Sequence, residues 1–435
     1  MRDFLPADKA RRDRVLGVIR SRFSVHGFDE IETPVMEDAS RLHSGLGGDN
    51  EKLGFAVLKR GLTPESLAAA ADAADLSDLG LRFDLTVPLA RFYATHRAQL
   101  PTVFRSIQIA PVWRAERPQK GRYRQFMQCD IDIIGEPGSL AEIELLTATA
   151  DTLDALGLDG FTFRINDRRL LTAMLTHFGF TPTEHDAVLI TVDKLDKIAE
   201  AGVVGELRER GFTAAAIDAL EQFFQRPKSD EPMPFGELAI AAALPVGIEP
   251  ALIAELAALG RAVNESRAGA DAAGADAAGA DAAGSVAVDV VEFDPFLVRG
   301  MGYYTGTIFE IAHPASTSSL GGGGRYDGMI GRFLGTNVAA AGFSIGFERI
   351  IDLLETSGEN ATESVALIHG ADVDQAQLLA LKTALISQGL RVRLERAPRN
   401  PRPLREQLAA SGFSRVATVT SQTRTTDDLS FTPLT

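Results

Sequence analysis

Apolar residues near the start of the chain recur at the spacing of an amphipathic helix. We expect this helix over residues 7–26, ending near Gly27, since glycine is common just past a helix C-terminus. Four apolar residues share one of its faces: Val15, Val18, Ile19 and Phe23. The next segment, FDEIETPVMED, alternates like a strand until Pro34, which cannot donate to a sheet ladder. The Ala-rich residues 65–79 predict a further helix.

Three β-favouring runs lie between Leu81 and Gly135: LRFDLTVPLA, TVFRSIQIAPVWR and FMQCDIDIIG. The polar, basic segment ERPQKGRYRQ separates the last two runs. This pattern predicts antiparallel strands joined by an exposed loop. Residues 139–156 then have a helical pattern, and the Leu/Ala-rich residues 165–260 predict a helical insertion.

Residues 267–285 repeat the sequence AGADA with a period of five. Glycine and aspartate recur in register, and large apolar residues are absent from the repeat. Such a segment cannot offset its ordering entropy by burial, so we expect a low-complexity, flexible acidic loop at the surface.

The composition changes after Gly358. The segments SVALIHG, LRVRLE and FSRVATVT are typical of strands, and helical patterns over 373–388 and 402–411 lie between them. This alternation predicts a small α/β domain over residues 362–435, following a large domain over 1–355.

Length and composition agree with this division. A chain of 435 residues is too long for one ordinary core, and no apolar run approaches the roughly 20 residues that a spanning helix needs. The N-terminal segment MRDFLPADKARRDR is charged where a signal peptide is apolar, so we expect a cytoplasmic protein with no membrane partner. Because Cys129 is the single cysteine and the histidines show no ligand spacing, we expect neither a disulfide nor a structural metal site.

The net charge of −15 taken alone argues against a polyanionic partner. Basic residues nevertheless cluster over residues 391–415, where seven arginines stand against two glutamates. A clustered surplus can bind phosphate even in an acidic protein.

The segment WRAERPQKGRYRQ contains five cations within eleven residues: Arg114, Arg117, Lys120, Arg122 and Arg124. One guanidinium group can bind two phosphate oxygens at once, so the segment fits a phosphate site. A solvated hairpin tip would have the same composition. The run GGGGRYDG permits close approach of a ligand or strand, or forms a turn.

Gln128, Asp130 and Asp132 alternate along one predicted strand and therefore share a face, which looks either into a cleft or into bulk solvent. The segment RGMGYYTGTIFE adds Arg299, Tyr303 and Tyr304 on a glycine-rich backbone. A cleft with carboxylates and tyrosines suits a cationic or polar ligand.

Five segments, in this order, resemble the class II aminoacyl-tRNA synthetases and, within them, the histidyl-tRNA synthetase family. HGFDEIETPVMED, VWRAERPQKGRYRQFMQCDIDIIG and AGFSIGFERI are similar to the three class II motifs. LVRGMGYYTGTIFEI and GGGGRYDGMIGRF are similar to two histidine-specific segments. The resemblance implies an α/β protein whose α+β catalytic domain has a class II antiparallel sheet flanked by helices. It also implies that residues 362–435 form an anticodon-binding-like domain.

The resemblance assigns residues to three ligands. Arg299 corresponds to the catalytic arginine that steadies the α-phosphate, and Arg114 shares this catalytic role. The other positions matched are, for ATP, Arg114, Arg122 and Arg349; for histidine, Asp84, Thr86, Gln128, Asp132, Tyr303 and Tyr304; and, for tRNA, Arg391, Arg393, Arg396 and Arg399. The chain departs from the family at Gly302, where an aspartate is usual, and has aspartate at positions 84 and 132 where many bacterial members have glutamate.

The implied reaction is that of a histidine–tRNA ligase, which converts L-histidine and ATP, with Mg²⁺, to histidyl-adenylate and then charges tRNA-His. A homodimer with Pro34 at its interface is also implied. The alternative is the non-catalytic, histidine-sensing regulatory subunit of ATP phosphoribosyltransferase. Such relatives typically lack the C-terminal domain and the ATP-contacting arginines, whereas Arg114, Arg299 and Arg349 stand in place here. A general RNA-binding module would explain the arginine cluster but not the five motifs.

Overall fold

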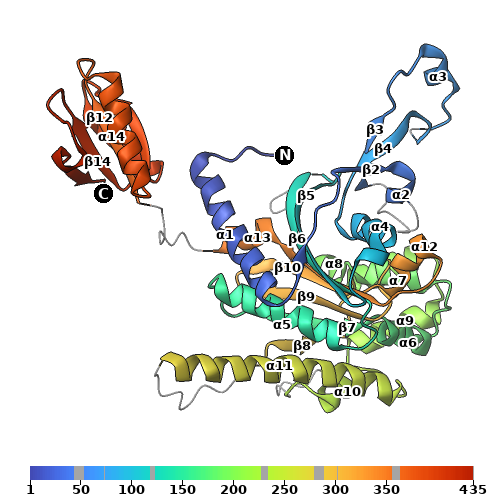
Figure 1. The fold of residues 1–435 in the computed structure, drawn as a ribbon. Coiled ribbons are helices and arrows are strands. Elements are labelled where there is room, and N and C mark those ends of the chain that lie inside the picture. Colours follow the sequence, from blue (N-terminus) through green and yellow to red (C-terminus); the bar gives the residue numbers. More distant parts are fainter. Residues whose placement is uncertain are drawn as a thin grey trace. The chain divides into compact units, whose positions relative to one another are not determined.

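The computed structural model describes residues 1–43, 53–72, 74–117, 123–226, 234–278, 289–300, 302–354 and 363–434 (Figure 1). The chain divides into two compact units. The first comprises Met1 with Leu16–Leu354, and the second comprises Arg2–Val15 with Glu355–Thr435. Each unit has its own sheet, and the two are described separately below.

An eight-stranded sheet forms the centre of the first unit, in the order β1-β5-β6-β11-β10-β9-β7-β8. Its inner pairs are antiparallel, and only the edge pairs β1–β5 and β7–β8 are parallel. The strands are β1 (Asp29–Glu30), β5 (Phe104–Trp113), β6 (Gln125–Ile134), β7 (Thr162–Asp167), β8 (Val291–Phe293), β9 (Thr307–His313), β10 (Ser316–Arg325) and β11 (Ala340–Gly346). The predicted antiparallel sheet is therefore confirmed at its centre, while the whole sheet is mixed.

The sheet is built around the hairpin of β5 and β6, which pair along ten residues each. On β6, Cys129, Ile131 and Ile133 have no exposed surface, which fixes the register because a slip of one residue would turn these side chains to the other face. The glycine run lies in β10, between β9 and β11, and is a central strand rather than a turn. Glycine is required there, since a Cβ on Gly323 would lie 1.9 Å from the Gly342 carbonyl oxygen.

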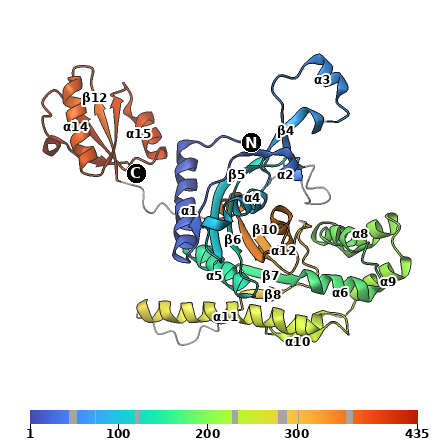
Figure 2. The same ribbon diagram turned by 45° about the vertical axis from the view of Figure 1, so that its right-hand side comes forward.

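Helices pack against the eight-stranded sheet. The predicted N-terminal helix is α1 (Pro6–Val25), in which Ile19 and Phe23 have no exposed surface. The helix predicted over 139–156 is α5 (Leu140–Ala155), which packs on β6 and β11 and has α11 (Pro250–Ala278) alongside it (Figure 2). Two short helices flank β11: α12 (Asp327–Leu334) and α13 (Phe347–Leu353).

The helical insertion lies between β7 and β8. It consists of α6 (Arg168–Phe178), α7 (His185–Val192), α8 (Leu195–Glu209), α9 (Ala214–Phe224), α10 (Glu237–Ala243) and α11. It begins later than predicted, because residues 165–167 belong to β7, where Phe163 and Ile165 alternate into the core without exposed surface.

Three further expectations were wrong in part. The LTVPLA segment forms α4 (Thr86–His96), because Asp84 accepts a 3.1 Å hydrogen bond from the Val87 N–H, and Pro88 lies in the first turn, where no N–H is needed. The Ala-rich residues 65–79 form only α3 (Pro64–Ala69) and a 3₁₀ turn before β4 (Ser77–Leu81) begins. Residues 267–278 of the AGADA repeat extend α11, since alanine is the strongest helix former and adds to an existing helix without new nucleation. The rest of the repeat lies outside the described residues.

A three-stranded sheet, ordered β2-β4-β3, projects from the first unit beside α2 (Ala39–His43) (Figure 1). Its outer strands are β2 (Met36–Asp38) and β3 (Phe55–Leu58). Strand β4 at its centre leads through Asp84 to α4.

The second unit contains a four-stranded sheet in the order β13-β12-β14-β15. It consists of β12 (Ser364–His369), α14 (Gln375–Ser387), β13 (Arg391–Arg396), α15 (Pro401–Ala410), β14 (Arg415–Val419) and β15 (Phe431–Pro433). Strand β12 pairs in parallel with β13 and β14, as the alternating pattern predicts, and its Val365 and Leu367 are fully buried against α14. The antiparallel β15 comes from the polar C-terminal segment, where no strand was expected.

None of the helices among the described residues is both long and apolar enough to span a bilayer.

Candidate active site

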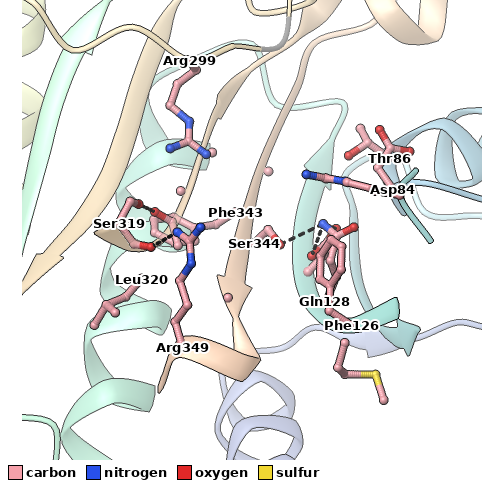
Figure 3. Close-up of a pocket in the computed structure, with 18 of the residues that line it drawn as sticks. Asp84, Thr86, Phe126, Gln128, Arg299, Ser319, Leu320, Phe343, Ser344 and Arg349 are labelled. Atoms are coloured by element: carbon pink, nitrogen blue, oxygen red, sulfur yellow. Dashed lines mark hydrogen bonds between the residues drawn. The ribbon is translucent and has the colours of Figure 1, made fainter. Parts of the chain in front are cut away.

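A cavity of about 290 Å³ lies over one face of the eight-stranded sheet, where β6, β11 and β10 run side by side (Figure 3). Segments distant in sequence meet there, from the start of α4 to the start of α13. Nine residues predicted to bind histidine or ATP line it together: Asp84, Thr86, Arg114, Gln128, Asp132, Arg299, Tyr303, Tyr304 and Arg349. Arg122, also predicted to bind ATP, lies outside the described residues.

The floor of the cavity follows from strand register. Gln128, Asp130 and Asp132 project from β6 toward the cavity, and their partners on β11 are Gly346, Ser344 and Gly342. Because glycine has no side chain, β11 leaves space at these two positions, and the Gln128 and Asp132 side chains of β6 extend into it. A Cβ on Gly342 would lie 2.0 Å from Asp132 Oδ1, so only glycine leaves room for this carboxylate.

Two carboxylates on β6 are buried. Asp132 accepts a 2.6 Å hydrogen bond from the Tyr326 hydroxyl, yet burial raises its pKa to about 7. Burial and the neighbouring Asp132 raise the pKa of Asp130 well above its ordinary value. The Gln128 amide donates to Ser344 Oγ over 3.1 Å and leans toward Asp130. The polar face therefore looks into a cleft, not into bulk solvent.

Two buried acceptors at this end lack a hydrogen-bond partner among the described residues. They are Asp84 Oδ2 and Gln128 Oε1. Burial raises the Asp84 pKa to about 6, although the positive charge of Arg114 opposes this rise. Buried acceptors are rarely left unpaired, so a donor group of a ligand, such as an ammonium, would satisfy both.

The adjacent tyrosines form one wall of the cavity. The ring centroids of Tyr303 and Tyr304 lie 4.8 Å apart, and Tyr326 meets Tyr303 edge-on at 6.0 Å. Burial raises the pKa of Tyr303 well above its ordinary value and raises that of Tyr304, so both remain neutral phenols that can donate and accept hydrogen bonds. Thr86 bonds to the Tyr303 side chain, which fixes the position of this wall relative to α4.

Three arginines enter the cavity from different elements. Arg114 follows β5, donates from Nε to the Phe83 carbonyl over 3.0 Å, and lies over the Phe126 ring at 5.1 Å. Arg349, in α13, donates to the Ser319 carbonyl. The Arg299 side chain points toward Arg349 from the opposite side of the cavity (Figure 3). Arg299 donates from Nη1 to Glu310 Oε2 over 3.0 Å.

The cavity thus has two chemically distinct ends. Asp84, Gln128 and Asp132 supply acceptors at the first end, where Arg114 lies close to Asp84. Arg299 and Arg349 supply donors and positive charge at the second end (Figure 3). A ligand with an amine at one end and phosphates at the other would be complementary to both ends. Among the described residues, no three His, Cys, Asp or Glu side chains are grouped to hold a metal ion.

Sequence reasoning missed several residues that shape this site. Tyr326 lies inside the GGGGRYDG segment, and Ser344 lies inside AGFSIGFERI. Their roles depend on β10 and β11 pairing across the sheet, which the sequence did not specify. Glu310, the partner of Arg299, ends the quoted segment RGMGYYTGTIFE, and strand alternation over TIFEI could have indicated its face.

The four arginines predicted to bind tRNA belong to the second unit. Arg391 and Arg393 lie on one face of β13 with their guanidinium groups over the Phe413 ring, at 4.3 and 4.8 Å. Arg396 and Arg399 are exposed.

Comparison with known proteins identifies the relatives of this chain. The family model described as histidyl-tRNA synthetase matches residues 1–350. A histidine–tRNA ligase of Leifsonia xyli subsp. xyli is 56% identical over 427 residues, which cover 97% of this chain and 95% of that protein. A probable histidine–tRNA ligase of Tropheryma whipplei is 43% identical, with 95% of this chain and 93% of the other covered.

Solved structures give the same fold. The histidyl-tRNA synthetase of Nostoc sp. PCC 7120 superposes with a TM-score of 0.68 at 25% identity, covering 96% of this chain and 90% of that one. A Bacillus halodurans protein described as an ATP phosphoribosyltransferase regulatory subunit/histidyl-tRNA synthetase has a TM-score of 0.69 at 19% identity, with 96% of each chain covered. At that identity the second likeness concerns the fold alone.

Proposed function

The chain belongs to the histidyl-tRNA synthetase family, and from this premise we propose that its cavity activates histidine with ATP and passes the histidyl group to tRNA-His. The protein is an aminoacyl-tRNA ligase. The observation that supports the proposal most strongly is the division of one cavity into an acceptor end and a guanidinium end.

At the acceptor end, Asp84 Oδ2 and Gln128 Oε1 accept hydrogen bonds from the histidine ammonium, which supplies the partners that both buried atoms lack. Asp132 accepts from the imidazole ring, and its own bond from Tyr326 orients it. Thr86, through its bond to Tyr303, and the two tyrosines close the wall around the substrate.

At the guanidinium end, Arg349 binds ATP phosphates and Arg299 faces the α-phosphate. Arg114 binds ATP phosphates from its position close to Asp84. The histidine carboxylate oxygen attacks the α-phosphorus, and the bond to pyrophosphate breaks. Negative charge grows on the phosphoryl oxygens in this step, and cations held in fixed positions stabilise it. The ribose hydroxyl of tRNA then attacks the histidyl carbonyl carbon, and AMP leaves. We also assign Arg122 to ATP on the family resemblance alone.

Mg²⁺ would accompany ATP as part of the substrate. This ion is commonly held by phosphates, waters and one or two carboxylates. The Glu348 carboxylate lines the cavity near Arg349, so one carboxylate and the phosphates could hold it there.

The assembly and location belong to the same proposal. The chain acts as a cytoplasmic homodimer, and the segment around Pro34 forms its interface. Val35 and Met36 support this, because these apolar side chains are 41% and 48% exposed in the single chain. The predicted domain over residues 362–435 holds the anticodon region through Arg391, Arg393, Arg396 and Arg399.

The regulatory-subunit alternative has less support from the site. A sensor of histidine needs the acceptor end, but it has no use for three arginines lining the same cavity. The test is ATP–pyrophosphate exchange by the purified protein with Mg²⁺ and each amino acid in turn. Exchange with histidine alone is expected; no exchange, with histidine still bound, would favour the regulatory alternative.

A further inference from the structure

The Arg299 guanidinium lies where β10 and β9 pair in the sheet. It crosses Gly322 on β10, where an added Cβ would lie 2.8 Å from both Cζ and Nη1. Gly322 pairs in the sheet with Glu310 on β9. The Glu310 Oε2 atom accepts the 3.0 Å bond from Arg299 Nη1. Gly322, which has no side chain, and the Glu310 carboxylate therefore together define where the guanidinium lies.

Glu310 is itself fixed from the other side. Its register partner on β7 is Arg164, which donates from Nη1 to Glu310 Oε1 over 3.0 Å. Arg164 also bonds to Asp294, and to Asp196 over 3.4 Å, so its guanidinium is held by several carboxylates. Each oxygen of Glu310 therefore accepts from a different arginine.

The groups around Arg299 stabilise its positive charge. Burial lowers its pKa, but Tyr304, Glu310, Asp193 and Tyr303 together raise it above the ordinary value. Of the two carboxylates, Glu310 is the one with a hydrogen bond to the guanidinium. The Glu310 side chain is 13% exposed, so solvent weakens this ion pair less than it weakens surface pairs.

We propose that Glu310 is a positioning residue for adenylate formation: it links Arg164 to Arg299 across the sheet and aims the Arg299 guanidinium at the α-phosphate. Gly322, which has no side chain, leaves space for the Arg299 guanidinium in this orientation. The proposal rests on the role of Arg299 given under the proposed function. Glu310 itself touches neither substrate, and it acts through Arg299.

Glu310→Gln is the informative change, because glutamine keeps the shape but has one acceptor oxygen and one donor NH₂ group. Two arginines need two acceptors, so one of them would face the NH₂ group. We expect single-turnover formation of histidyl-adenylate to slow by about tenfold or more, since small misplacements of catalytic groups cost up to roughly 10²-fold. The KM for histidine should stay within about twofold, because the acceptor end is unchanged.

Glu292→Gln is the matched control. Glu292 on β8 is the register partner of Arg164 on its other side, and it is exposed. This variant should form adenylate at the wild-type rate. Thermal unfolding of each variant separates a folding defect from a positioning defect.

A double-mutant cycle completes the test. In an Arg299→Ala background, Glu310→Gln should cause no further loss, because the group that it positions is gone. A loss of less than about tenfold in Glu310→Gln alone, or an equal loss in both backgrounds, would overturn the positioning role. The wild-type rate distinguishes this failure from a failure of the proposed function: if the wild type forms no adenylate, the function itself is wrong.

Discussion

Arginines serve two regions of this molecule in opposite ways. In the cavity, Arg114, Arg299 and Arg349 are partly buried, and each donates to a named carbonyl or carboxylate. On and beside β13, Arg391, Arg396 and Arg399 are exposed. The first region fixes a few guanidinium groups in position, whereas the second presents positive charge to solvent.

The difference indicates what each region can recognise. Buried, hydrogen-bonded charges interact strongly over short distances and act on one reacting group. Exposed charges are screened within roughly 8–10 Å at physiological salt, so they attract a polyanion through their sum. We therefore expect changes in the cavity to have large effects on chemistry, and changes near β13 to have graded effects on tRNA binding.

The largest effect should come from Arg299→Ala. Loss of one donor to a developing oxyanion typically costs 10²–10³-fold in rate, so adenylate formation should fall by roughly that factor or more. Arg332→Ala, at an exposed position on α12, is the control and should retain the wild-type rate. Near-normal adenylate formation in Arg299→Ala, measured in single turnovers, would remove the central distinction between the two regions.

Gly342→Ala should disturb the acceptor end. The new Cβ would lie 2.0 Å from Asp132 Oδ1, so the carboxylate must leave its bond with Tyr326. We expect the KM for histidine to rise by about tenfold, the size of one lost hydrogen bond to a charged group. Gly205→Ala, in α8 with open space around the added Cβ, should bind histidine normally and unfold at a slightly higher temperature. An unchanged KM in Gly342→Ala would show that Asp132 does not contact the imidazole.

A smaller effect should appear in the dependence of stability on pH. The Asp132 pKa is about 7 in the folded chain and about 4 when unfolded. Its contribution to stability is therefore present below about pH 4 and is lost as the pH rises through 7. Without histidine, the free energy of unfolding should decrease between about pH 5 and pH 8, and Asp84, with a pKa of about 6, adds to the decrease.

Asp132→Asn should flatten this dependence, because asparagine does not titrate. Urea unfolding at several pH values, at constant ionic strength, measures the effect. A wild-type stability that rises with pH over the same range, or an equal slope in Asp132→Asn, would contradict the raised pKa of this buried carboxyl group.

The smallest effects should come from single arginines near β13. Arg396→Ala or Arg399→Ala should weaken tRNA binding by a few-fold and lower the slope of log K against log salt by about one. Arg424→Ala, which is exposed in the same unit but lies beyond β14, should leave the slope unchanged. Slopes that do not change in any variant would make the β13 cluster an ordinary solvated face.

Local pattern was enough to predict much of the fold. The ten-residue strands β5 and β6, the helix α5 and the alternation in the second unit follow from apolar periodicity over long segments. The errors occurred where tertiary context decides. The β-favouring LTVPLA became helical because the Asp84 side chain supplied a bond to its first turn, and the AGADA repeat continued a helix that was already nucleated.

The candidate site was predicted residue by residue from the family resemblance, but its supporting contacts were not. Asp132 was expected at the imidazole, yet its dependence on Gly342 and Tyr326 requires the β6–β11 register and the position of α12. Likewise Arg299 was expected, whereas the Glu310–Arg164 pair joins strands that lie more than a hundred residues apart in sequence. Local spacing contains no information about such pairs.

The central claim is that the cavity performs the chemistry while the β13 arginines only hold tRNA. The most direct test compares two activities of one variant in which Arg391, Arg393, Arg396 and Arg399 are all changed to Ala. Histidine-dependent ATP–pyrophosphate exchange should remain at the wild-type rate, and charging of tRNA-His should fall sharply at physiological salt. Exchange that falls as far as charging, or charging that survives intact, would contradict the account.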